Sequence, residues 1–156
     1  MTLTSLTSLS PVQTEQLWRL FQEEWWTKGR SLEDVQALLR HSDFLFGYAE
    51  TDGTLVAFAR ALTDHLYRTL LLDVVIAPEY RKKGIGERLM KNILAHPVLS
   101  KVESTVLFCR PELVTFYERC GFSAANVGVV PMRISRTSGK VSPSDRPSKD
   151  ATDRRN

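Results

Sequence analysis

Two adjoining stretches decide the fold: Leu70-Leu71-Leu72-Asp73-Val74-Val75-Ile76, which is almost wholly apolar, and Arg81-Lys82-Lys83-Gly84-Ile85-Gly86, which opens an amphipathic segment. A buried strand that leads through a glycine-bearing turn into a helix start presents backbone N–H groups without intrahelical partners at the positive end of the helix dipole. Such a start holds phosphate oxygens, and the preceding cations suit a pyrophosphate. The same composition also occurs in plain solvated turns.

Two familiar phosphate-binding motifs, the P-loop and the Gly-x-Gly-x-x-Gly dinucleotide fingerprint, do not match this spacing. The turn instead resembles the Arg/Gln-x-x-Gly-x-Gly/Ala acetyl-CoA signature of the GNAT superfamily of N-acetyltransferases. Residues 76–80 are similar to the family's lead-in to that turn, and Phe116-Tyr117-Glu118-Arg119-Cys120-Gly121-Phe122 is similar to its Phe-Tyr-x-x-x-Gly-Phe signature. The resemblance covers about residues 55–134, and residues 58–64 look like a bacterial, cyanobacterial and plastid branch.

Length and composition predict one domain. A chain of 156 residues with 42% hydrophobic content can bury one core but not two. We expect a single acetyltransferase domain over residues 1–136 and a disordered basic tail over 137–156, which has almost no large apolar residue. The formal net charge of +3 falls to +1 without the tail's five basic and three acidic residues. This nearly neutral body gives no reason to propose a nucleic-acid partner.

Periodicity and turn chemistry predict an α/β (α+β) arrangement, and the resemblance implies a mixed central β-sheet flanked by helices on both faces. Capping patterns at Ser10 and Ser31 begin two helices, the first of which should run to about Thr27. Further helices follow the glycine turn and Pro111. The expected strands cover about residues 44–50, 54–63, 69–77, 102–109 and 127–135.

The remaining features exclude several classes of protein. Cys109 on a buried strand and Cys120 on an apolar helix face are expected to be reduced core residues, and no metal-ligand spacing surrounds them. Residues 1–10 lack the pattern of a secretory signal, and no run of 18 apolar residues occurs. We therefore expect a cytoplasmic protein with neither a membrane partner nor a metal.

The resemblance implies acetyl-CoA as the acetyl-donor cosubstrate. In this family two strands splay apart beside the turn, and the pantetheine arm pairs with the main chain of one of them while the pyrophosphate lies on the turn. Arg110 occupies a place where many relatives have an asparagine that contacts the cofactor. The implied cofactor contacts are Val74, Val75, Ile76, Arg81, Lys82, Lys83, Gly84, Ile85, Gly86, Glu87 and Arg110.

Tyr117 is the candidate general acid, since the resemblance places its phenol near the thioester sulfur. A phenol with a pKa of about 10 is protonated at neutral pH and can donate to a departing thiolate of pKa about 8.5. The alternative is a core tyrosine on the inner face of a helix.

Asp73 is an anomaly, because an ionised carboxylate within an apolar strand is costly unless it is paired or faces a wet cavity. It could bind the acceptor's ammonium and take its proton through water. The alternative is a structural aspartate paired with Arg60 or His65. Trp25 and Trp26 lie where helices of this fold usually border the acceptor pocket, so they are candidate pocket walls; as ordinary core aromatics they would have no such role.

Together these residues predict N-acetylation of a primary amine by direct attack in a ternary complex. The acceptor would be a small-molecule amine or a peptide. A non-catalytic acyl-CoA sensor, and an enzyme that acetylates protein N-termini or lysines, remain as alternatives. Homodimers are common among relatives, but no surface stripe identifies an interface.

Overall fold

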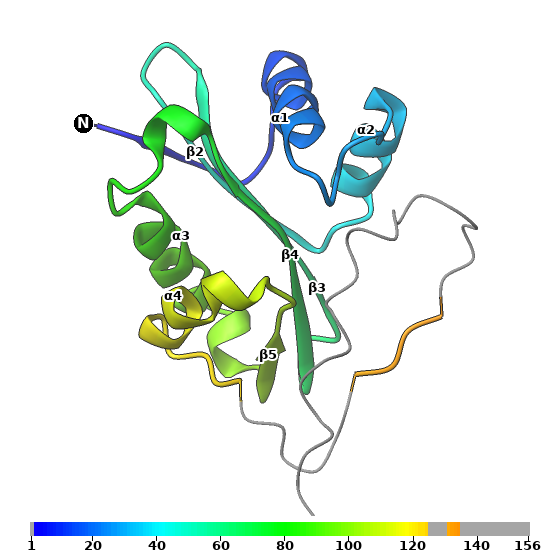
Figure 1. The fold of residues 1–156 in the computed structure, drawn as a ribbon, viewed down its shortest axis with the longest axis vertical. Coiled ribbons are helices and arrows are strands. Elements are labelled where there is room, and N and C mark those ends of the chain that lie inside the picture. Colours follow the sequence, from blue (N-terminus) through cyan, green and yellow to red (C-terminus); the bar gives the residue numbers. More distant parts are fainter. Residues whose placement is uncertain (1, 125–130, 135–156) are drawn as a thin grey trace, which may run out of the picture. The chain divides into compact units, whose positions relative to one another are not determined.

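The chain folds into a five-stranded sheet with helices on either side (Figure 1). A computed structural model describes residues 2–124 and 131–134. The chain divides into two units, 1–123 and 124–156, and all helices and strands described here belong to the first. They are β1 (Thr4–Leu6), α1 (Pro11–Glu23), α2 (Leu32–Arg40), β2 (Phe44–Ala49), β3 (Leu55–Thr63), β4 (Arg68–Ile76), α3 (Ile85–Leu94), β5 (Ser104–Val106) and α4 (Val114–Arg119), with short 3-10 helices at Pro78–Tyr80, Leu99–Lys101 and Pro111–Leu113.

The strands lie in the order β1-β2-β3-β4-β5. The first four pair antiparallel, and β5 runs parallel to β4, so the predicted mixed sheet is confirmed. The hairpin between β2 and β3 is also where the Asp52-Gly53 pair predicts it. Sequence analysis missed β1, a three-residue strand that pairs with the far end of β2, because so short a run gives almost no periodic signal.

Two apolar clusters fill the space between the sheet and its helices. One joins α1 and α2 to the sheet and includes Leu17, Phe21 and Val35, all fully buried. The other joins α3 and α4 to the sheet and includes Leu89 and Met90. Figure 1 shows the two helix pairs on opposite sides of the strands, as the resemblance implies. We call these sides the α1/α2 face and the α3/α4 face.

Capping chemistry starts both N-terminal helices as predicted. Ser10 and Ser31 each form a complete capping box, and Pro11 occupies the first turn of α1. However, α1 ends at Glu23 rather than near Thr27, because the chain is extended at Glu24. The Thr27 hydroxyl then donates to the carbonyl of Phe21 at 2.8 Å, which satisfies a free carbonyl of the last turn.

Two predictions about the second half of the chain need correction. The strand expected over 102–109 contains only Ser104–Val106, so Cys109 lies outside it and is exposed rather than buried; both cysteines are free thiols. The strand expected over 127–135 lies outside the described residues except for 131–134, which are not in a strand. The tail over 137–156 also lies outside them. Within the described part of the chain, no helix is long and apolar enough to cross a bilayer.

Candidate active site

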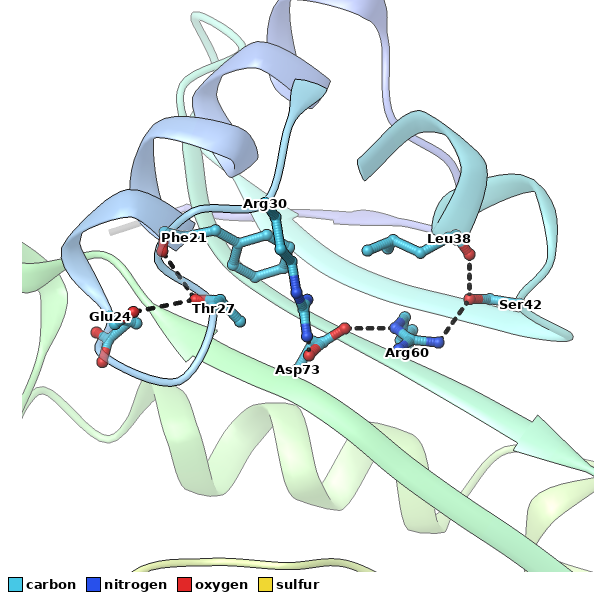
Figure 2. A network of polar contacts seen from close by, with 8 residues as sticks. All are labelled: Phe21, Glu24, Thr27, Arg30, Leu38, Ser42, Arg60 and Asp73. Atoms are coloured by element: carbon cyan, nitrogen blue, oxygen red, sulfur yellow. Dashed lines mark hydrogen bonds and ion pairs between the residues drawn. The ribbon is translucent and has the colours of Figure 1, made fainter. Parts of the chain in front are cut away.

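The site is organised by a β-bulge in β4. The register between β3 and β4 shifts between Phe58 and Arg60, so that two residues of β4, Asp73 and Val74, lie opposite Ala59. Asp73 has a positive φ of 53°, which is uncommon for a residue other than glycine. The bulge turns its side chain toward the α1/α2 face, where Figure 2 shows it between two arginines.

Before it reaches the bulge, β4 loses its neighbour on one side. Its pairing with β5 ends at Leu70 and Val106. Among residues 2–124 and 131–134, the later part of β4 pairs only with β3. Unpaired backbone at a strand edge accepts an added strand. Within the described residues, β4 at Val74 and Val75 therefore has no strand partner on the side away from β3. The splay of strands that the resemblance implies would require such an edge.

The turn after β4 presents an open helix start. Gly84 is the N-cap of α3 with a left-handed φ of 76°, and no side chain caps the first amides. A Cβ at Gly84 would meet nothing within 4 Å. Arg81, Lys82 and Lys83 before it are exposed. Free amides, the helix dipole and the ammonium groups of Lys82 and Lys83 together fit the pyrophosphate of an acyl-CoA.

Other predicted contacts in this turn already have partners within the protein. A Cβ on Gly86 would lie 3.1 Å from the Phe116 ring, so this glycine makes room for α4. Arg81 donates from Nε to the Ile76 carbonyl at 2.9 Å and pairs with Glu24 at 2.5 Å, which ties the end of β4 to the end of α1. These two residues have structural roles that the motif does not reveal.

Two further predicted cofactor residues form weak surface contacts. Glu87 lies 3.5 Å from Arg119, and both side chains are at least half exposed. The ammonium of Lys83 lies 5.5 Å from the ring centre of Tyr80. Contacts of this kind between exposed groups are worth little, so a ligand could displace them.

Tyr117 is buried on α4, with 8% of its surface exposed. Its ring lies edge-on to Phe116 and Phe122, with centroid distances of 4.9 and 5.8 Å. Burial raises the pKa of the phenol to about 12, and the charges of Cys109 and Cys120 act in the same direction. The Tyr117 hydroxyl is therefore protonated at any physiological pH and is available as a proton donor.

Asp73 lies in an ion-pair cluster that sequence analysis foresaw only in part. Arg60 Nε donates to its Oδ2 at 2.5 Å, which confirms one of the two pairings considered. Its Oδ1 lies 3.1 Å from Nη1 of Arg30. The Asp73 side chain is only 3% exposed, so both carboxylate oxygens are engaged in a nearly dry environment. His65 instead contacts the ring of Phe44.

Arg30 is the residue that sequence reasoning missed. It lies in the connection between α1 and α2, where its carbonyl accepts hydrogen bonds from Trp18 Nε1 at 3.1 Å and Gln22 Nε2 at 3.0 Å. Its guanidinium lies 5.1 Å from the ring centre of Phe21 (Figure 2). No motif marks this position. The available signal was indirect, since a buried Asp73 requires cations from somewhere else in the chain.

The two tryptophans predicted as pocket walls are on the surface. Trp25 is 58% exposed and Trp26 is 37% exposed. The Arg110 guanidinium stacks over the Trp25 ring at 4.3 Å, so the structure brings a predicted pocket residue and a predicted cofactor residue together. Trp26 packs against Phe21 with a centroid distance of 6.2 Å. Neither is an ordinary core aromatic, and Trp25 is accessible to a ligand.

A bulged central strand, an edge without a strand partner in the described residues and a glycine turn at a helix start suit an acyltransferase, and the comparison with known families gives that class. The sequence model of the acetyltransferase (GNAT) family matches residues 11–122. The chain belongs to this family and is an N-acetyltransferase by class.

Individual relatives are only moderately similar. The "Uncharacterized N-acetyltransferase ycf52" of Porphyra purpurea is 28% identical over 120 residues, which cover 75% of this chain and 68% of the relative. "Serotonin N-acetyltransferase 2, chloroplastic" of Oryza sativa subsp. japonica is 30% identical over 60% of this chain and 48% of its own length. The crystal structure of a putative GNAT acetyltransferase from Xanthomonas campestris pv. campestris is 29% identical, with a TM-score of 0.75 over 86% of this chain and 94% of that one.

Proposed function

We propose that this protein transfers an acetyl group from acetyl-CoA to a primary amine by direct attack within a ternary complex. One observation carries the proposal: β4 bears a free edge beyond Leu70 and continues directly into the uncapped start of α3. The main chain of β4 thus offers hydrogen-bonding groups to an extended arm, and the helix start a few residues later offers backbone amides to a pyrophosphate.

Particular residues would hold the cosubstrate. The main chain of Val74 and Val75 would pair with the pantetheine arm, and the amides from Lys82 to Glu87 would bind the pyrophosphate. Arg110 remains a candidate contact, because a guanidinium that stacks on a ring keeps its N–H donors in its own plane, and its bond to Glu112 Oε1 is long, at 3.5 Å, and exposed. When bound, acetyl-CoA supplies the thioester carbonyl carbon that the amine attacks.

Tyr117 donates a proton to the departing thiolate in this proposal. Transfer from a phenol of pKa about 12 to a solvated thiolate of pKa about 8.5 would be uphill. A thiolate that forms in the same buried surroundings is desolvated too, so its pKa rises for the same physical reason. Shared burial therefore reduces the difference in pKa between the Tyr117 phenol and the departing thiol.

We assign the amine's proton to water rather than to Asp73. Both oxygens of that carboxylate already face guanidinium groups, so neither is free to receive a proton from the acceptor. Asp73 serves instead to hold Arg30 and Arg60 beside the bulge. The acceptor amine loses one proton to solvent before it attacks. After the attack its nitrogen loses a second proton to solvent, which balances the proton that Tyr117 gives to the thiolate and regains from solvent.

The test is acetyl-CoA-dependent thiol release by the purified full chain, across aryl-, alkyl- and polyamines and short peptides. Turnover with any of these acceptors supports the proposal and names the acceptor class. Acetyl-CoA binding by calorimetry without any turnover would favour a non-catalytic acyl-CoA sensor. Absence of binding would overturn the assignment of the cosubstrate itself.

A further inference from the structure

The cluster around Asp73 carries more positive than negative charge. Two guanidiniums, those of Arg30 and Arg60, contact one carboxylate. Arg60 also lies 3.5 Å from the hydroxyl of Ser42, which is neutral. Among residues 2–124 and 131–134, no second carboxylate pairs with either arginine, so the cluster keeps one uncompensated positive charge.

Arg30 is the member that can reach a ligand. Its Nη1 is buried and makes no hydrogen bond within the described residues, although it lies 3.1 Å from Asp73 Oδ1. The Arg30 side chain is 29% exposed, against 13% for that of Arg60. Hydrogen bonds from Trp18 and Gln22 to its carbonyl fix the backbone at this position, while the guanidinium itself contacts Asp73 and the Phe21 ring.

The cluster lies next to the proposed reaction centre. Asp73 is adjacent to Val74, whose main chain is proposed to receive the pantetheine arm, and its side chain faces the α1/α2 side. A guanidinium is suited to bind a carboxylate through two parallel hydrogen bonds.

We propose that the acceptor is an amine that also bears a carboxylate, and that Arg30 binds this carboxylate. The inference rests on the proposed acetyl transfer and names its substrate class. Arg30 is thereby a specificity residue, with Asp73 and Arg60 as positioning residues. A polyamine, which brings a second cation to a site that is already positive, fits poorly.

The experiment compares matched acceptors that differ only in the carboxylate: tryptophan with tryptamine, and phenylalanine with phenethylamine, with putrescine as the dication. For the full chain we expect kcat/KM at least tenfold higher for the acid-bearing member of each pair. Arg30→Gln should raise KM for the acidic acceptor much more than for the plain amine, and so reduce the ratio of their kcat/KM values toward one. Arg30→Lys should restore part of the preference.

Arg19→Gln is the matched control, since it removes an exposed arginine of α1 that pairs with the exposed Glu15. This variant should leave kcat/KM unchanged for both members of each acceptor pair. Should Arg30→Gln fail to fold, 3-phenylpropionate supplies a second test on the unchanged protein. It should inhibit phenethylamine acetylation competitively, because it offers the carboxylate without an amine.

The outcomes separate the two proposals. Equal turnover of both members, or a preference for the plain amines, overturns the carboxylate site and leaves acetyl transfer standing. An equal loss of turnover of both members in Arg30→Gln identifies Arg30 as a structural brace and also overturns the site. A lack of inhibition by 3-phenylpropionate counts against it in the same way. If no acceptor is acetylated at all, both the proposed function and this inference are overturned.

Discussion

The two faces of the sheet are built in different ways. On the α3/α4 face, the candidate cosubstrate site comes from consecutive residues, since β4 leads directly into the glycine turn and α3. On the α1/α2 face, the charged cluster draws Arg30, Arg60 and Asp73 from a helix connection and two strands. The first site depends on main chain and local sequence, whereas the second depends on tertiary structure. This difference explains why the candidate cosubstrate site could be predicted from a sequence motif, whereas the charged cluster could not.

The largest expected effect is on the α3/α4 face. Tyr117→Phe removes the proton donor but keeps the buried ring, so kcat should fall by about 10²–10⁴-fold, the usual contribution of a positioned acid. Acetyl-CoA affinity, measured by calorimetry, should change little. Tyr67→Phe is the control, because that tyrosine is 62% exposed. Equal kcat in the two variants would remove Tyr117 from the mechanism.

A smaller effect is expected from the cluster on the α1/α2 face. Asp73→Ala leaves the guanidinium of Arg60, whose side chain is 13% exposed, without its counter-ion, so the free energy of unfolding should fall by about 3 kcal/mol. Glu103→Gln breaks a pair with Arg68 in which both side chains are 63% exposed, and should cost under about 1 kcal/mol. Urea unfolding of the two variants measures the difference. Similar losses of unfolding free energy in the two variants would mean that the Asp73 cluster contributes no more to stability than an exposed ion pair.

This contrast also explains how much of the fold and of the candidate site could be predicted from the sequence. The order of the main strands and helices followed from periodicity and capping, and the turn from its motif. The anomaly at Asp73 could be recognised, since a charge in an apolar strand demands a partner. The identity of Arg30 could not, because it depends on how α1 and α2 pack over the bulge. The same holds for Gly86, whose neighbour Phe116 is thirty positions away.

Gly86 offers a test within the α3/α4 face. Gly86→Val would force a branched side chain into a ring 3.1 Å from its first carbon, and such overpacking typically costs about 1–3 kcal/mol of the free energy of unfolding. Phe116→Leu should relieve part of this cost, so the double variant should be more stable than the sum of the single effects predicts. Additive losses in thermal unfolding would show that Gly86 is not required by α4.

The smallest expected effect is the absence of a decline in kcat at alkaline pH. Tyr117 must be protonated to donate, and burial raises its pKa from about 10 to about 12, so its protonated form persists above pH 10. The folded state therefore holds this proton more tightly than the unfolded chain, and the associated stability is present below pH 10 and lost as pH rises through about 12. Between pH 7 and 10, kcat should rise or level off as the bound amine loses its proton, with no alkaline decline. A decline with a midpoint within that range would show that the donor is a more acidic group than the buried phenol, and would shift the search to the exposed Cys109 thiol nearby.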